Sequence, residues 1–146
     1  MGLLNSVKNF VTGGGAEVIV NIENPVIDGS EPLRLSISAT AKEETLAVKK
    51  VYVEVKAEEK SANTKLLYNT TIELEKNVQL SAGENKSWSC EVPIPEDIPA
   101  TFFGRHSSMQ WYVNAGLDVP GMDPDSGWQK FVVNRPITFS KDSKSN

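Results

Sequence analysis

The sequence has 146 residues, of which 39% are hydrophobic and 23% charged, and its formal net charge is −4. This is the composition of an ordinary globular domain, and a chain of this length can bury about 70% of its unfolded surface without a disulfide or a metal. The acidic balance argues against nucleic acid as a partner, because phosphate binding needs a basic face. The single cysteine, Cys90, excludes an internal disulfide and agrees with a reducing compartment.

The first residues predict a short amphipathic helix that ends at the glycine triplet 13–15. Its apolar stripe is formed by Leu3, Val7 and Phe10. A helix of about ten residues is marginal by itself. We therefore expect the stripe to cover one end of the domain or to pack on a second copy, with a membrane-surface anchor as the alternative. The segment does not read as a secretory signal, and no apolar run reaches the ~18 residues of a membrane span. A cytoplasmic protein is the simplest expectation.

From Ala16 onward the apolar residues recur every second position, which is the period of a half-buried strand. Seven such segments are predicted: 16–22, 33–41, 47–57, 66–80, 88–94, 109–119 and 131–139. No helical pattern is long enough to join parallel strands, so the sequence predicts an all-β, two-sheet antiparallel sandwich. The predicted organisation is a helix and glycine linker at 1–15, a sandwich at 16–140 and a disordered tail at 141–146.

The stretch from Met109 to Val119 alternates over eleven positions and predicts the central strand, with one buried and one wetted face. The residues before it include Pro93, Pro95 and Pro99, which cannot pair inside a sheet. We expect them to form a rigid connection from one sheet to the other. Pro136 places the last strand at a sheet edge or marks a bulge.

The sequence contains no pattern that points to catalysis. The one histidine, His106, is followed by Ser107, and neighbours on a strand face opposite sides, so a surface or structural histidine is expected. Cys90 has the parity of a core residue and predicts an inert thiol. Without a phosphate loop or a zinc pattern, the sequence predicts neither enzymatic activity nor a cofactor.

One acidic loop contains Asp118, Asp123 and Asp125. Loops at the end of a sandwich can converge carboxylates on calcium, so these three are weak candidates for metal ligands. Asp-Pro and Asp-Ser-Gly are also ordinary turn formers. A calcium- or membrane-responsive sandwich is therefore the alternative function, and the sequence assigns no metal.

The run GRHSSMQWYVNAGLDVPGMDPDSGWQKFVVN, with IPEDIPATFFG before it, resembles the bacterial and archaeal sporulation-control proteins, which have the arrestin fold. The turns at 28–31 and 82–84 look like turns of that family. The more distant similarity is to the N-terminal half of arrestins and of retromer-type arrestin relatives. Family members carry a second sandwich after the first, and we expect functions that need two domains not to transfer.

The resemblance implies an arrestin-like, immunoglobulin-like sandwich without enzymatic activity, which acts by binding other proteins in the cytoplasm. Protein partners, including a second copy of the chain, are therefore expected, and strand edges are ready templates for such contacts. The candidate partner-binding residues are Leu3, Val7 and Phe10 of the helix stripe and Arg135 at the predicted edge.

Overall fold

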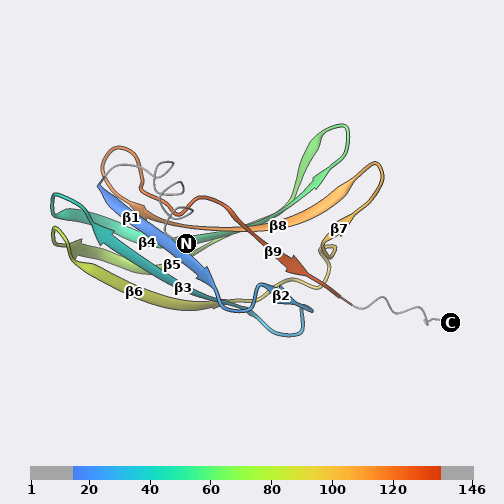
Figure 1. Cartoon of the computed structure of the whole chain (residues 1–146), viewed down its shortest axis with the longest axis horizontal. Helices are drawn as coiled ribbons and strands as arrows, with labels where there is room; N and C mark the ends of the chain where they lie inside the picture. The colour runs from blue at the N-terminus through green and yellow to red at the C-terminus, as the bar shows by residue number, and fades with distance from the viewer. Residues whose placement is uncertain (1–14, 136–146) are drawn as a thin grey trace.

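The computed structural model describes residues 15–135 as two β-sheets packed face to face around one core (Figure 1). The smaller sheet has the order β1-β3-β6, and the larger has the order β2-β9-β8-β4-β5 with β7 added on β8. The strands are β1 (Ala16–Ile22), β2 (Val26–Ile27), β3 (Leu33–Ala41), β4 (Leu46–Lys60), β5 (Thr64–Leu80), β6 (Asn85–Val92), β7 (Phe102–Phe103), β8 (Ser108–Asp118) and β9 (Gln129–Val133). The predicted all-β, two-sheet architecture is confirmed.

Strands rather than helices form because side chains of alternating character let each strand bury one face. In β3 every odd residue from Leu33 to Ala41 is buried, and every even residue is half-exposed. β1 and β6 pair antiparallel with its two edges. Within the described residues there is no helix, and therefore none long and apolar enough to cross a membrane.

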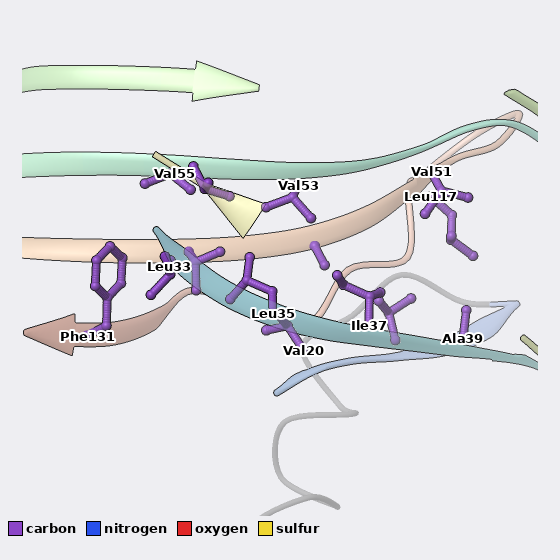
Figure 2. Close-up of a cluster of buried hydrophobic side chains, with 14 of the residues drawn as sticks. Val20, Leu33, Leu35, Ile37, Ala39, Val51, Val53, Val55, Leu117 and Phe131 are labelled. Carbon is purple, nitrogen blue, oxygen red and sulfur yellow. The ribbon is translucent and has the colours of Figure 1, made fainter. Parts of the chain in front are cut away.

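The core lies between the two sheets and is drawn from both of them. Figure 2 shows Leu33, Leu35 and Ile37 of the smaller sheet pointing toward side chains of the larger sheet. Those partners are Val51, Val53, Val55, Leu117 and Phe131. Trp111 is the largest fully buried side chain, and its ring lies 5.9 Å from that of Phe131. The buried residues of both sheets thus form one hydrophobic cluster.

β8 is the middle strand of the larger sheet, as predicted, but the expectation of one wetted face is wrong. Gln110 is 6% exposed and Asn114 is 4% exposed, although both face away from the core. β4 lies on one side of β8, with β9 and the residues after β8 on the other. Their long side chains cover the second face, which alternation within β8 cannot reveal.

The segment 93–101 leaves β6 in the smaller sheet and enters β7 in the larger one, which confirms the predicted proline-rich crossing. Two side chains fix its position by donating hydrogen bonds to its backbone carbonyl groups. Trp111 Nε1–H donates to Pro99 O at 3.0 Å, and the Arg135 guanidinium donates to Ile98 O and Pro95 O.

At two positions the burial of the side chain differs from the alternation predicted from the sequence. Ala47 is exposed and Val48 is buried in its place, and Leu66 is 53% exposed where burial was expected. The pairing of β4 with β5 shifts register between Val51 and Tyr52 and between Ala57 and Glu58. Each irregularity adds a residue to one strand and moves its neighbours to the opposite face.

Residues 15–135 form nine strands instead of the seven predicted, because two short strands carry too few residues to show a period. One of them, β2, pairs in parallel with Val132 and Val133 of β9. β9 is therefore not an edge strand at Val132 and Val133, while Pro136, where the edge or bulge is predicted, lies outside the described residues. The predicted N-terminal helix, the residues from Pro136 onward and the predicted tail lie outside the described residues.

Candidate interaction surface

The larger sheet has a face that turns away from the smaller sheet, and we call it the outer face. Three outward residues of β4 pair with three of β8: Tyr52 with Gly116, Glu54 with Asn114 and Lys56 with Tyr112. They face outward because they alternate with the core residues of the same strands. The hairpin return after β8, residues 123–128, runs alongside these pairs, since Gly116 bridges to Asp125 and Ser126 N–H donates to Ala115 O.

The first pair depends on Gly116 having no side chain. A β-carbon at Gly116 would lie 2.5 Å from the hydroxyl oxygen of Tyr52, so the phenol occupies the space above the glycine. From there Tyr52 donates a 3.0 Å hydrogen bond to Asp123 Oδ2 on the hairpin return. Burial raises the pKa of Tyr52 well above its usual value, and the hydrogen bond to Asp123 and the nearby carboxylates act in the same direction. The phenol is therefore a neutral donor that ties β4 to the return.

The second pair forms a buried polar network. Asn114 Nδ2 donates to Glu54 Oε1 at 3.0 Å, and its carbonyl oxygen lies 3.3 Å from the hydroxyl of Ser126. The Ser126 hydroxyl also accepts the N–H of Ala115 at 3.0 Å, and Ser126 is only 2% exposed. Satisfied polar groups of this kind fix one arrangement of the backbone. The hairpin return is thus held rigidly against β8.

The third pair supports an exposed aromatic residue. Lys56 Nζ lies 4.2 Å from the ring centroid of Trp128 and 5.3 Å from that of Tyr112. It also forms a 2.9 Å salt bridge with Glu58, and the two rings meet edge to face with centroids 6.5 Å apart. The position of the Lys56 ammonium near the two rings and the edge-to-face arrangement of the rings are both favourable geometries. Trp128 keeps 43% of its surface exposed, so it presents a fixed indole to solvent.

Two carboxylates of the acidic loop accept hydrogen bonds from other groups of the same chain. Asp123 accepts hydrogen bonds from Val119 N–H and Tyr52, and Asp125 Oδ1 accepts from Gly127 N–H at 2.9 Å. Burial raises the pKa of Asp125, the Gly127 bond opposes it, and the charges of Glu54 and Asp123 add to the rise. Across residues 15–135 no three acidic, histidine or cysteine side chains come together as a metal site would require. Asp118, Asp123 and Asp125 therefore do not converge.

The predicted partner-binding residues fall in different places. Leu3, Val7 and Phe10 lie outside the described residues. Arg135 is half-buried, and its guanidinium donates to the backbone of the crossing segment. A β-carbon at Gly29 would lie 2.7 Å from Arg135 Nε, so the turn at 28–31 packs against the same side chain. The structure thus gives Arg135 a role inside the fold.

The two residues considered for chemistry also have clear positions. His106 is exposed in the loop between β7 and β8. Cys90 faces inward on β6 but is only half-buried, because β6 is an edge of the smaller sheet, and this burial raises the pKa of its thiol. The outer-face residues Tyr52, Glu54, Lys56, Asn114 and Trp128 were not singled out from the sequence. The one signal in the sequence was a glycine inside a strongly alternating strand, which often marks a close approach.

Residues 6–131 match the family model described as SpoOM protein, Spo0M. The chain belongs to the Spo0M family. Consistent with this, its fold is similar to the crystal structure of Spo0M, the sporulation control protein from Bacillus subtilis, with a TM-score of 0.70 and 13% sequence identity. The match covers 85% of this chain and 51% of that one, so the chain spans about half the length of that Spo0M structure.

The fold of this Spo0M-family chain is also similar to a part of the alkylpurine DNA glycosylase AlkC from Pseudomonas fluorescens, solved bound to DNA containing an abasic site analogue. The TM-score is 0.51 at 15% identity, with 92% of this chain and 36% of that chain covered. At such identities both likenesses concern the fold alone. A comparison with curated protein sequences finds no match.

Proposed function

We propose that this Spo0M-family chain is a non-enzymatic, cytoplasmic protein-interaction module with a regulatory or scaffolding role. In this proposal its two sheets form an arrestin-like sandwich, and its partners are proteins, including a second copy of the chain. Membership of the Spo0M family supports the regulatory role. The described ionisable groups of the outer face are engaged in contacts that hold the fold, which supports binding rather than chemistry.

The observation that carries the proposal is the exposed indole of Trp128. Its position is fixed by Lys56 and Tyr112, and the residues before it are anchored by Ser126. Tryptophan and tyrosine are enriched among residues that dominate binding energy. A side chain that is already ordered loses little entropy when a partner covers it. Trp128 therefore has the properties of an anchor for a partner.

The charges around Trp128 indicate the chemistry of the partner. Glu54, Asp123 and Asp125 lie close enough along the same face to affect one another electrostatically. Lys56 and Lys130 lie on the same face, because each pairs with Tyr112. A complementary partner surface would have an apolar pocket for the indole, acidic side chains toward the lysines and basic side chains toward the carboxylates.

The outer face is a better docking surface than the free edge of β5. β5 is 17 residues long and pairs only with β4 among the described strands. Its pairing is broken by two register shifts, and Asn77 within it has a φ of 54°. Such irregularities are devices by which edge strands avoid pairing with other chains.

The test is affinity capture from the native host with wild-type protein and with Trp128→Ala. The substitution leaves the Lys56–Glu58 salt bridge in place, so the thermal unfolding midpoint should change little. Phe103→Ala is the matched control, because Phe103 is a 75% exposed aromatic residue on β7 that takes no part in the contacts of Trp128 with Lys56 and Tyr112. We expect Trp128→Ala to lose a protein that wild type and Phe103→Ala both retain. An unchanged set of captured proteins would contradict the proposal, and a tagged copy that retains an untagged one would identify self-association.

A further inference from the structure

An apolar groove lies at the end of the larger sheet where β4 begins. Its volume is about 610 Å³, and its apolar lining is Ala47, Val48, Val78, Val119 and Pro120. Val48 and Val51 are both buried three positions apart, so alternation is interrupted in β4, and Asn77 has a φ of 54°, so the backbone of β5 leaves the extended conformation beside the groove. The groove thus forms where β4 and β5 depart from a regular pleat and the loop after β8 passes beside them.

The chain enters the described fold next to this groove. A β-carbon at Gly15 would lie 3.3 Å from Leu46 Cδ2, and Leu46 immediately precedes Ala47 in β4. Lys42 N–H donates to Gly15 O at 2.9 Å, which fixes the backbone at this point. Gly15 has a φ of 99°, a conformation that lets glycine turn the chain sharply. The described part of the chain therefore begins at a fixed position, with Gly15 against Leu46.

The sequence supplies an occupant of matching chemistry. Leu3, Val7 and Phe10 form the apolar stripe of a predicted amphipathic helix, and Lys8 is the only charged side chain between Leu3 and Val11. The five residues from Val11 to Gly15 span at most about 17 Å, so Phe10 is restricted to the neighbourhood of Leu46. A short tether of this kind gives a high effective concentration at a nearby site.

We propose that the N-terminal segment Leu3–Val11 of the same chain docks in this groove as a helix, with Leu3, Val7 and Phe10 facing its apolar lining. Docking supplies the packing that a helix of about ten residues needs for stability. The side chain of Asp118, which lines the groove, forms no hydrogen bond or salt bridge within residues 15–135 and is available to Lys8. The groove is then covered by the chain itself, and the exposed Trp128 is left for a partner.

Disulfide trapping in the full chain tests this proposal. In a Cys90→Ser background, Phe10→Cys is combined with Ala47→Cys, which places one thiol on the stripe and one on the groove. The matched control combines Asn9→Cys with Ala47→Cys, because Asn9 has nearly the same tether but lies on the opposite side of the predicted helix. We expect the Phe10 pair to form an intramolecular disulfide at least tenfold faster than the Asn9 pair under mild oxidation. Equal rates would show an undocked tether, and a disulfide-linked dimer would show docking on a second copy; either result overturns the proposal.

Hydrogen exchange provides an independent readout without new thiols. The variant Val7→Asp places a charge on the stripe and should release the segment from the groove. We expect exchange of backbone amides at 47–49 and 77–79 to accelerate severalfold, with amides of β3 unchanged. The control Asn9→Asp adds the same charge on the opposite side and should leave exchange as in wild type. No change in Val7→Asp would contradict docking, and an acceleration that includes β3 would assign the effect to general destabilisation and also overturn it.

Discussion

The hydroxyl of Tyr52 on β4 occupies the place that a side chain at position 116 of β8 would fill, and it donates to Asp123 beyond β8. A β-carbon at Gly116 would lie 2.6 Å from Tyr52 Cζ as well as 2.5 Å from the hydroxyl. One aromatic side chain therefore joins two strands and the hairpin return, and this works only because position 116 carries no side chain.

Gly116→Ala should destabilise the protein by about 1–3 kcal/mol, because the added methyl group displaces the Tyr52 ring. The backbone itself tolerates alanine, since Gly116 is not among the described glycines with positive φ. Urea unfolding measures the change. In a Tyr52→Ala background the same substitution should cost less than half as much, because the clash is gone. An equal cost in both backgrounds would assign the effect to the backbone instead of Tyr52.

Tyr52→Phe should reduce the loss of stability at high pH. The raised pKa of Tyr52 means that the folded state keeps a proton that the unfolded state loses above about pH 10. The contribution is therefore complete below the unfolded pKa and declines as the pH rises above it. Urea midpoints between about pH 9 and 11 should fall more steeply for wild type than for Tyr52→Phe. Parallel curves would show that Tyr52 is no more protonated in the folded state than in the unfolded state.

Asp125→Asn should stabilise the protein at neutral pH. Its raised pKa means that the ionised carboxylate is disfavoured in the folded state, so its contribution declines as the pH rises above about 4. Asparagine removes the charge, and its carbonyl oxygen can still accept the N–H of Gly127. The gain should be below about 1 kcal/mol because water screens this partly exposed group. Melting temperatures from about pH 4 to 7 test this, and Glu43→Gln, on an exposed turn, should follow wild type.

Arg135→Lys should destabilise the protein by about 1–3 kcal/mol, because a lysine ammonium cannot reproduce the planar fork that donates to Ile98 O and Pro95 O. Thermal unfolding measures the loss, and limited proteolysis should show faster cleavage in segment 93–101. The control is Arg34→Lys, whose 3.1 Å salt bridge with Glu31 is exposed and should contribute less than about 1 kcal/mol. Similar effects of the two substitutions would contradict the structural role of Arg135.

The sequence predicts the parts of the fold that depend on alternation. The central position of Met109–Val119, the burial of Trp111 and Val113, and the proline-rich crossing all follow from local patterns that the sheet preserves. Alternation fails at Ala47 and Leu66, because register shifts between strands are not encoded in the period of either strand. It also fails for the covered face of β8, where burial depends on neighbours distant in the sequence.

Local patterns could not predict the candidate surface either, because its contacts join residues that are distant in the sequence. Lys56 and Trp128 are 72 positions apart, and their contact follows from the order β9-β8-β4 and from the path of the hairpin return. The acidic residues near Trp128 were visible in the sequence, but their use as hydrogen-bond acceptors for Tyr52 and backbone N–H groups required the register of β4 on β8.

The hydrogen bonds from Arg135 to the crossing segment have a mechanical consequence. Tension applied to the backbone after residue 135 reaches Pro95 and Ile98 through the guanidinium, and reaches β2 through the parallel ladder on Val132 and Val133. The load is thus shared between the link that joins the two layers and a pair of strands pulled lengthwise. A force on that side of the chain would strain the contact between the two sheets together with the pairing of β2 on β9.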